Sequence, residues 1–236
     1  MGLSPPPLFL PKKALLVAAT DTECGKTVAT LALAAYWQTQ RPAATLGVMK
    51  LVQAGPGDRE TYRQVLRLNQ TDREWNPLYF EAPLAPPLAA ALEGRVPDLA
   101  LAWQSFQGLC ARCDWILVEA AGGLGTPIDW AWTFADLAHH WRLPVVLVVP
   151  VQLGCIAQTV ANVALARQYD LNLRGILLNC RHPRTAAEID QWAPHALIQS
   201  LTQAPILGLL PYLEYPLDPS ALAAAAAGLD WELLLP

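Results

Sequence analysis

Charged residues are scarce in this chain, and no basic run occurs. They make up 15% of the residues, with 16 Lys and Arg against 20 Asp and Glu and a formal net charge of −4. Nucleic acids and anionic membranes bind basic surfaces, so this composition argues against both partners. Long apolar runs are missing too, because no segment approaches the ~20 residues of a membrane-spanning helix. We therefore expect no nucleic-acid or membrane partner, and a cytoplasmic protein.

Cysteine is also sparse. Five cysteines, an odd number spread along the chain, indicate reduced thiols rather than a disulfide framework. Cys110 and Cys113 form a C-x-x-C pair, but the pair precedes a predicted strand instead of opening a helix, where a thiolate would be stabilised. We expect packing cysteines there. The adjacent His139 and His140 cannot share one helix face, so we expect them at the surface rather than on a metal.

The 236 residues, 53% of them hydrophobic, suffice for a substantial core. Short apolar runs alternate with helical patterns from one end to the other, without a linker or an internal repeat. This alternation predicts a single α/β domain over residues 1–236, a doubly wound, mostly parallel sheet flanked by helices. Residues 1–12 are proline-rich and carry lysines after the apolar residues, so we expect a flexible N-terminal segment rather than a secretory signal.

The individual elements follow from local patterns. The predicted strands are 13–19, 46–50, 114–119, 143–150, 175–180 and 206–211. Helices are predicted to open after Gly25, at 58, at 98, at the capping box 133–136, at 155 and at the Asp-Pro pair 218–219. Asp58 suits a helix N-cap by its chemistry alone. Residues 51–57 are predicted to be a turn-rich loop, and the proline-rich stretch 76–97 an irregular excursion without a central strand or long helix.

The stretch 15–28 is the most informative. An apolar run breaks into a polar, glycine-containing turn and continues as a helix. Such a turn ending in Gly25, Lys26 and Thr27 directs backbone N–H groups at a phosphate, while the lysine neutralises charge and the threonine hydroxyl can bind Mg²⁺. The common G-x-x-x-x-G-K-[ST] pattern requires glycine at position 20, where this chain has Thr20. Phosphate binding therefore needs support from the rest of the chain.

That support comes from the ends of two other strands. Lys50 ends one predicted strand, and Glu119 ends another directly before a glycine-rich turn. A strand-terminal acid can simply face solvent, but ligand crevices of parallel sheets form at the carboxyl ends of their strands. Together with Lys26, Thr27 and Asp58, these residues could hold a nucleoside triphosphate with Mg²⁺ and stabilise a transferring phosphoryl group.

Six segments then carry a resemblance to a known family. They are 20–28 (TDTECGKTV), 50–55 (KLVQAG), 76–83 (NPLYFEAP), 118–123 (VEAAGG), 133–136 (TFAD) and 153–155 (LGC). In this order, over nearly the whole chain, they resemble dethiobiotin synthetase, the ATP-dependent enzyme family of biotin biosynthesis. The family's phosphate loop has one extra residue, so Ala19 stands where its first glycine lies. The implied fold is similar to that of P-loop NTPases.

The resemblance implies a reaction and a set of residues. 7,8-Diaminononanoate would react with CO₂ and ATP, with Mg²⁺, through a carbamate and a carbamic-phosphoric anhydride, in a homodimer. Catalysis is implied for Thr22, Lys26 and Lys50, and metal binding for Thr27, Asp58 and Glu119. The implied nucleotide contacts are Glu23, Cys24, Gly25, Lys26, Thr27, Val28, Asp58, Glu119, Ala120, Ala121, Gly122, Asn179, Cys180, Pro211, Tyr212 and Leu213. The implied substrate contacts are Thr22, Lys50, Ala54, Gly122, Gly154, Cys155 and Ile156, the last three from the partner subunit.

The chain departs from the family at several positions. Ala19 and Ala120 stand where glycine is usual, Leu51 where proline is usual, Ala54 where serine or threonine is usual, and 85–87 (APP) where Ser-Pro-His is usual. Loss of the hydroxyl at Ala54 predicts altered substrate affinity with retained activity.

Three alternatives stay open. A regulatory or partitioning ATPase of the P-loop group typically has an additional lysine early in the loop, and residues 20–24 contain none. A cobyrinate-type amide-forming enzyme would bring a glutaminase domain, for which 236 residues leave no room. The third alternative is a non-catalytic relative of the synthetase.

Overall fold

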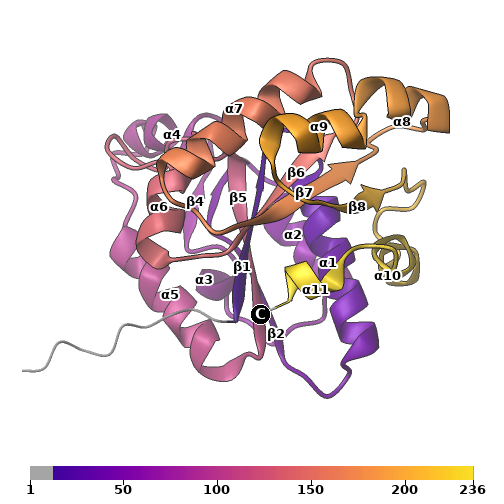
Figure 1. Cartoon of the computed structure of the whole chain (residues 1–236). Helices are drawn as coiled ribbons and strands as arrows, with labels where there is room; N and C mark the ends of the chain where they lie inside the picture. The colour runs from indigo at the N-terminus through magenta and orange to yellow at the C-terminus, as the bar shows by residue number, and fades with distance from the viewer. Residues whose placement is uncertain (1–12, 236) are drawn as a thin grey trace, which may run out of the picture.

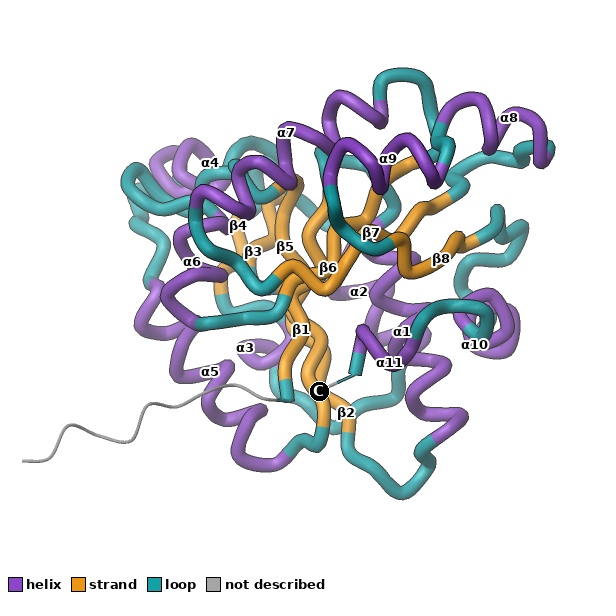
Figure 2. The backbone as a smooth tube through the Cα atoms, in the orientation of Figure 1, coloured by secondary structure: helices purple, strands orange, loops and turns teal. Residues whose placement is uncertain are grey.

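A computed structural model describes residues 13–235, so the expectation for residues 1–12 lies outside the described residues. The strands are β1 (Ala14–Ala19), β2 (Leu46–Lys50), β3 (Val52–Ala54), β4 (Leu78–Phe80), β5 (Trp115–Gly123), β6 (Val145–Pro150), β7 (Leu173–Asn179) and β8 (Ile206–Leu210). The helices are α1 (Lys26–Gln40), α2 (Asp58–Val65), α3 (Asp72–Trp75), α4 (Pro86–Leu92), α5 (Leu99–Arg112), α6 (Phe134–Trp141), α7 (Cys155–Gln168), α8 (Ala186–Trp192), α9 (His195–Thr202), α10 (Pro219–Ala226) and α11 (Trp231–Leu234). Figures 1 and 2 show their arrangement.

The main sheet confirms the predicted fold class. Six strands lie in the order β2-β5-β1-β6-β7-β8, and every pairing is parallel. The chain moves from β1 to β2 on one side and later from β5 to β6 on the other, so its direction across the sheet reverses at β1. In such sheets the carboxyl ends of the strands beside this reversal form the ligand crevice. The loop after β1 therefore lies where a ligand is expected.

Different helices cover the two faces of the main sheet (Figure 1). Leu15 and Val17 of β1 belong to a core with residues of α1, α2, α10 and α11. Leu16 and Ala18 lie in a second core with α4, α5 and α6, and β6 and β7 share a third core with α7 and α9. Because successive side chains of a strand point to opposite faces, a continuously apolar run such as β1 serves both layers.

Two predicted irregular segments contain short regular elements. Within 51–57, β3 pairs in parallel with β4 from the proline-rich stretch, forming a separate two-stranded sheet. In the same stretch α4 begins with Pro86 and Pro87, which fit the first helical turn because its N–H groups have no helical partner. The expectation of irregular structure was therefore wrong at these places, while the exclusion of a central strand and a long helix is confirmed.

Among residues 13–235, no helix is both long enough and apolar enough to cross a membrane.

The capping box of α6 gives a test of local stability. The N–H of Asp136 donates to Thr133 Oγ1 at 3.3 Å, and Asp136 Oδ2 accepts from the N–H of Thr133 at 2.8 Å. We expect Thr133→Ala to lower the free energy of unfolding by about 1 kcal/mol, because it leaves the Asp136 N–H in the first helical turn without its side-chain partner. Thr133→Ser retains the oxygen and should match the parent. Urea denaturation of the three proteins measures the difference as a shift of the unfolding midpoint. Equal midpoints for the parent and Thr133→Ala would contradict the expectation.

Candidate functional site

The turn from β1 into α1 forms a loop around one lysine. Gly25 is the N-cap of α1 with φ 83°, a left-handed conformation that favours glycine. A Cβ at this position would lie 2.1 Å from Asn179 Nδ2, so the close approach of β7 also requires glycine. Lys26 is 6% exposed, and its Nζ donates to the Asp21 carbonyl at 3.0 Å. The loop backbone therefore surrounds the Lys26 ammonium group at the N-terminus of α1. This is the arrangement of an anion-binding site.

Lys26 has little compensation for its charge. Burial lowers its pKa, and the nearby positive charge of Lys50 lowers it further, outweighing the attraction of Glu119 and Asp58. A bound anion would supply the missing negative charge. This electrostatic state favours a phosphate-binding role for the loop.

Three strand or helix ends converge beside the loop. Lys50 and Glu119 are direct neighbours in the register of β2 and β5, and Lys50 Nζ lies 2.6 Å from Glu119 Oε1. The same ammonium lies 2.7 Å from Asp58 Oδ2 at the start of α2. Thr27 donates its hydroxyl to Asp58 Oδ1 at 2.8 Å and to Glu119 Oε1 at 3.2 Å. The residues predicted to gather, including Lys26 of the adjoining loop, are thus brought together.

Burial and pairing set the pKa values of this cluster. Burial raises the pKa of Glu119, and Lys50 only partly opposes the shift. Burial alone would lower the pKa of Lys50, but the charges of Glu119 and Asp58 raise it overall. Asp58 is more open: burial would raise its pKa, yet Lys50 and the Thr27 hydroxyl bring it below the usual value. Lys50 is thus paired with both carboxylates and offsets part of their charge.

The oxygens of this cluster fit Mg²⁺ chemically. Two carboxylates, from Asp58 and Glu119, each lie within hydrogen-bonding distance of the Thr27 hydroxyl. Mg²⁺ prefers oxygen ligands and in phosphate sites takes one or two carboxylates, with water and phosphate completing its shell. This set has only two carboxylates, and residues 13–235 contain no group of three or more His, Cys, Asp or Glu that could hold a metal ion.

The predicted N-cap role of Asp58 was wrong. Gly57 is the N-cap of α2, and Asp58 is the first helical residue. Gln53 of β3 replaces the missing capping side chain, because its Oε1 accepts the N–H of Arg59 at 2.9 Å. The carboxylate of Asp58 is therefore free to contact Lys50 and Thr27.

Two hydroxyls in the site were not predicted from the sequence. Thr30 donates to Glu119 Oε2 at 2.9 Å, and the Tyr62 hydroxyl donates to the same oxygen. Thr30 follows Thr27 by three residues and Tyr62 follows Asp58 by four, spacings that place each pair on one helix face. That spacing was the available signal, but an apolar helix face accounts equally well for both residues.

The glycine-rich end of β5 continues the site. The carbonyl of Ala120 accepts from Lys50 Nζ at 3.2 Å. Ala121 is half-buried, and Gly122 has φ 82°, where an added Cβ would lie 2.4 Å from Thr126 Oγ1. Lys50 thus links β2 to this turn as well as to Glu119.

The predicted nucleotide residues of β7 and β8 lie beside the phosphate loop. Asn179 donates Nδ2 to the Cys24 carbonyl at 2.9 Å, so this amide also anchors the loop. The N–H of Cys180 donates to the Leu210 carbonyl at 2.9 Å, bringing residues 211–213 next to the end of β7. Among them Tyr212 is 43% exposed.

The remaining loop residues face outward or pack inward. Thr22 and Glu23 are exposed, and the Glu23 carboxylate lies 3.7 Å from the guanidinium of Arg181. Cys24 is buried, whereas Val28 is partly buried and packs against the core.

Four predicted substrate residues lie outside this cluster. Ala54 ends β3 and is half-buried. Residues 154–156 begin α7, where Gly154 and Ile156 line an apolar groove of about 620 Å³. Cys155 is fully buried, so its side chain cannot contact a ligand in the groove.

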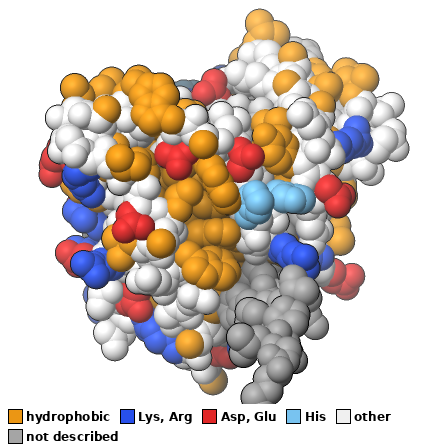
Figure 3. Space-filling view, turned by 90° about the vertical axis from the view of Figure 1, so that its left-hand side faces the viewer, with side chains coloured by type: hydrophobic (Ala, Val, Ile, Leu, Met, Phe, Trp, Pro, Cys, Tyr) orange, Lys and Arg blue, Asp and Glu red, His pale blue; other side chains and the backbone are white. Residues whose placement is uncertain are grey.

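The other predicted surface and packing residues behave as expected. All five cysteines are free, and burial raises the pKa of Cys110 to about 12. His139 and His140 are exposed. Hydrophobic side chains gather on the surface over α4, α5 and α6 (Figure 3), where Leu88 and Leu92 are 47% and 70% exposed.

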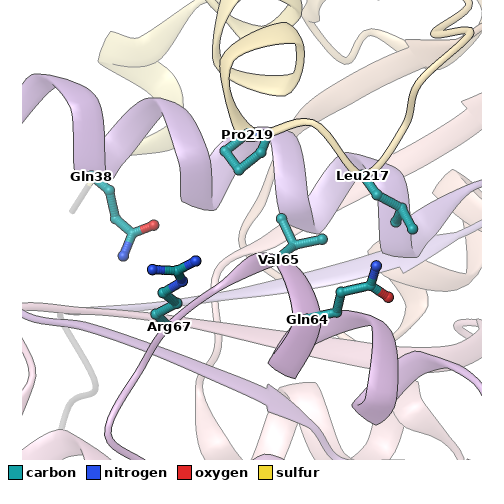
Figure 4. A pocket seen from close by; sticks show the side chains of 6 residues that line it. All are labelled: Gln38, Gln64, Val65, Arg67, Leu217 and Pro219. Atoms are coloured by element: carbon teal, nitrogen blue, oxygen red, sulfur yellow. The ribbon is translucent and has the colours of Figure 1, made fainter.

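A further cavity of about 430 Å³ lies at the opposite end of α1 from Lys26 (Figure 4). It is lined by Gln38, Gln64, Val65, Arg67, Leu217 and Pro219. This cavity shares no residue with the Lys50 cluster.

Lys26 gives a prediction about ligand-free stability. Folding lowers its pKa, so its buried charge destabilises the fold at every pH below the normal lysine pKa. We expect Lys26→Met to raise the free energy of unfolding by about 0.5–2 kcal/mol, the range common for single stabilising substitutions. ATP should raise the melting temperature of the parent but not of Lys26→Met.

The matched control is Lys13→Met, an exposed lysine whose replacement should change neither stability nor the ATP-induced shift. Differential scanning fluorimetry with and without ATP measures both quantities. A Lys26→Met protein less stable than the parent would contradict the electrostatic argument.

Solved structures share the fold. A ParA family ATPase from Chlorobium tepidum superposes with a TM-score of 0.57 at 12% identity, covering 94% of this chain and 96% of that one. MinD from Aquifex aeolicus gives 0.54 at 14% identity, covering 91% and 95%. These neighbours confirm the P-loop NTPase-like fold, and at such identities they support the fold alone.

Sequence relatives identify the family. A family model described as an AAA domain matches residues 13–220. ATP-dependent dethiobiotin synthetase BioD of Gloeothece citriformis is 52% identical, over 94% of this chain and 99% of that protein. The same-named protein of Gloeobacter violaceus is 49% identical over 91% and 93%, and BioD 1 of Salmonella typhi is 35% identical over 85% and 90%. With these identities along nearly its full length, the chain belongs to the ATP-dependent dethiobiotin synthetase family of enzymes.

Proposed function

We propose that this protein catalyses the ATP-dependent carboxylation and ring closure of 7,8-diaminononanoate with CO₂ to give dethiobiotin. Family membership supports the overall reaction. One observation carries its assignment to this site: Lys50 Nζ lies 2.6 and 2.7 Å from Glu119 and Asp58, directly beside the phosphate loop. The site thus combines an anion-binding loop with a second cation and an oxygen donor set.

The proposed reaction has three steps. One substrate amine adds to CO₂ and loses a proton, which gives a carbamate. A carbamate oxygen then attacks the γ-phosphorus of ATP, ADP leaves, and a carbamic-phosphoric anhydride remains. The second amine attacks the carbonyl carbon, phosphate leaves with the loss of a proton, and the new C–N bond closes the ring.

The two buried lysines serve the phosphoryl step. Carbamate and γ-phosphate are both anions, and Lys26 and Lys50 would offset their mutual repulsion. Both lysine residues are almost fully buried, at 6% and 4% exposure, where charge interactions are screened less than in water. Thr22, in the exposed turn of the loop, would contact the substrate.

Thr27, Asp58 and Glu119 would hold Mg²⁺. When bound, the ion would withdraw negative charge from the phosphates. Asn179, Cys180 and residues 211–213 would bind the adenine, since they lie together at the carboxyl ends of β7 and β8.

We further infer a homodimer, in the cytoplasm, that pairs across α7. The groove along this helix is apolar, with Leu153 86% exposed and Leu201 50% exposed. A second copy would cover these side chains. The N-terminus of α7, from Gly154 to Ile156, is a positive helix end that suits the carboxylate of the partner's substrate.

The departures from the family pattern are compatible with activity. Ala19 and Ala120 lie in strands β1 and β5, where φ is negative and alanine is unstrained. At Ala54 no hydroxyl is present, so we expect a change in substrate affinity rather than in the phosphoryl step.

The reaction itself provides the first test. Purified protein with ATP, Mg²⁺, 7,8-diaminononanoate and labelled bicarbonate should incorporate the label into a cyclic urea. ATP hydrolysis should depend on both the diamine and bicarbonate, because the carbamate is the phosphoryl acceptor. Hydrolysis that ignores both compounds would favour a regulatory ATPase, and no hydrolysis would favour a non-catalytic relative.

Substitutions of Glu119 and Lys50 provide the second test of the proposed function. We expect Glu119→Gln and Lys50→Met to lower turnover by about 10²–10³-fold, the scale of losing one preorganised electrostatic group. Lys13→Met, at an exposed site, should retain full turnover. Circular dichroism would verify the fold of each variant, and near-parent turnover in a folded variant would remove that residue from the mechanism.

A further inference from the structure

The two oxygens of the Glu119 carboxylate have different partners. Oε1 lies 2.6 Å from Lys50 Nζ and accepts from the Thr27 hydroxyl at 3.2 Å. Oε2 instead accepts from the Thr30 hydroxyl at 2.9 Å and from the Tyr62 hydroxyl. One oxygen therefore belongs to the charged cluster, and the other is occupied by two neutral donors.

The two donors come from the same helices that supply the other members of the cluster. Thr30 lies in α1 one turn after Thr27, and Tyr62 lies in α2 one turn after Asp58. Both Thr30 and Tyr62 are 0% exposed, so water does not compete for these hydrogen bonds. Each helix thus contributes one oxygen to the proposed cation site and one hydroxyl to Glu119.

We propose that Tyr62 and Thr30 are positioning residues that fix Oε2 of Glu119, so that Oε1 alone is presented toward Thr27 and Asp58. The inference rests on the proposed Mg²⁺-dependent function. The terminal torsion of a glutamate is broad and roughly two-fold, so an unrestrained carboxylate could offer either oxygen or both. Two hydroxyl donors on one oxygen remove this freedom, and outer groups of this kind orient the ligands of metal sites.

Tyr62 also packs in the core, and the two roles can be separated. Its ring stacks on that of Trp75, with ring centroids 6.2 Å apart and an interplanar angle of 13°. Tyr62→Phe retains the ring and removes only the hydroxyl. Thr30→Val likewise keeps the shape of the side chain without the donor, whereas Thr30→Ser keeps the donor.

Mn²⁺ binding measured by electron paramagnetic resonance tests the proposal without turnover. Each protein is titrated with Mn²⁺ at one fixed concentration of the non-hydrolysable analogue AMPPNP. We expect Tyr62→Phe and Thr30→Val to weaken Mn²⁺ binding about 10- to 100-fold, as other outer groups of metal sites do. Thr30→Ser should match the parent. Tyr36→Phe is the control, because Tyr36 is a half-buried tyrosine that stacks on Trp231, outside the cluster.

Steady-state kinetics adds a second readout. The Mg²⁺ concentration needed for half-maximal activity should rise in Tyr62→Phe, while kcat at saturating Mg²⁺ stays near that of the parent. A purely structural role would instead lower stability without changing the metal dependence.

The outcomes are distinct. Parent-like Mn²⁺ affinity in folded Tyr62→Phe and Thr30→Val would overturn the proposal and leave the proposed function intact. A parent that binds no Mn²⁺ beyond AMPPNP alone would overturn the metal assignment, and this proposal with it. If Tyr62→Phe does not fold, the difference in Mn²⁺ affinity between Thr30→Val and Thr30→Ser tests the proposal. Equal affinities in these two variants would overturn it.

Discussion

The buried ion pair between Lys50 and Glu119 is the interaction on which the rest of the site depends. Glu119 is 0% exposed, and a carboxylate can remain charged there only with close partners. The parallel register of β2 and β5 supplies the first partner by placing Lys50 directly beside it. Thr27, Thr30 and Tyr62 then tie α1 and α2 to the same carboxylate. The orientation of both helices toward the sheet is therefore coupled to one side chain.

Much of this arrangement could be predicted, because its determinants are local. The apolar run ending in Lys50 gave the bounds of β2 as observed, and the carboxyl-end rule for parallel sheets brought Lys50 and Glu119 to one edge. Contacts between helix and strand side chains were harder to predict from the sequence. Tyr62 reads as an apolar-face residue whether or not its hydroxyl meets Glu119, and only the assembled fold distinguishes the two cases. The short strands β3 and β4 carry no periodicity and form only by pairing with each other.

Asn179 shows how a family role and a structural role can share one residue. The resemblance implies a contact with adenine, and that role is part of the proposed function. In the described structure its amide donates to the Cys24 carbonyl, and its close approach leaves no room for a side chain at position 25. The glycine of the phosphate loop is thus fixed both by its own backbone conformation and by a neighbour from β7, a constraint that no local sequence pattern could indicate.

The two lysines of the site differ in electrostatic compensation, and the difference bears on ligand binding. Lys50 already has two carboxylates within 2.7 Å, and their charge raises its pKa. Lys26 is bonded to a backbone carbonyl, and burial together with Lys50 lowers its pKa. An incoming anion therefore gains more by pairing with Lys26, whose charge is less compensated, than with Lys50. Since Lys26 lies at the N-terminus of α1, the phosphate loop rather than the carboxylate cluster should be the primary anchor of the nucleotide.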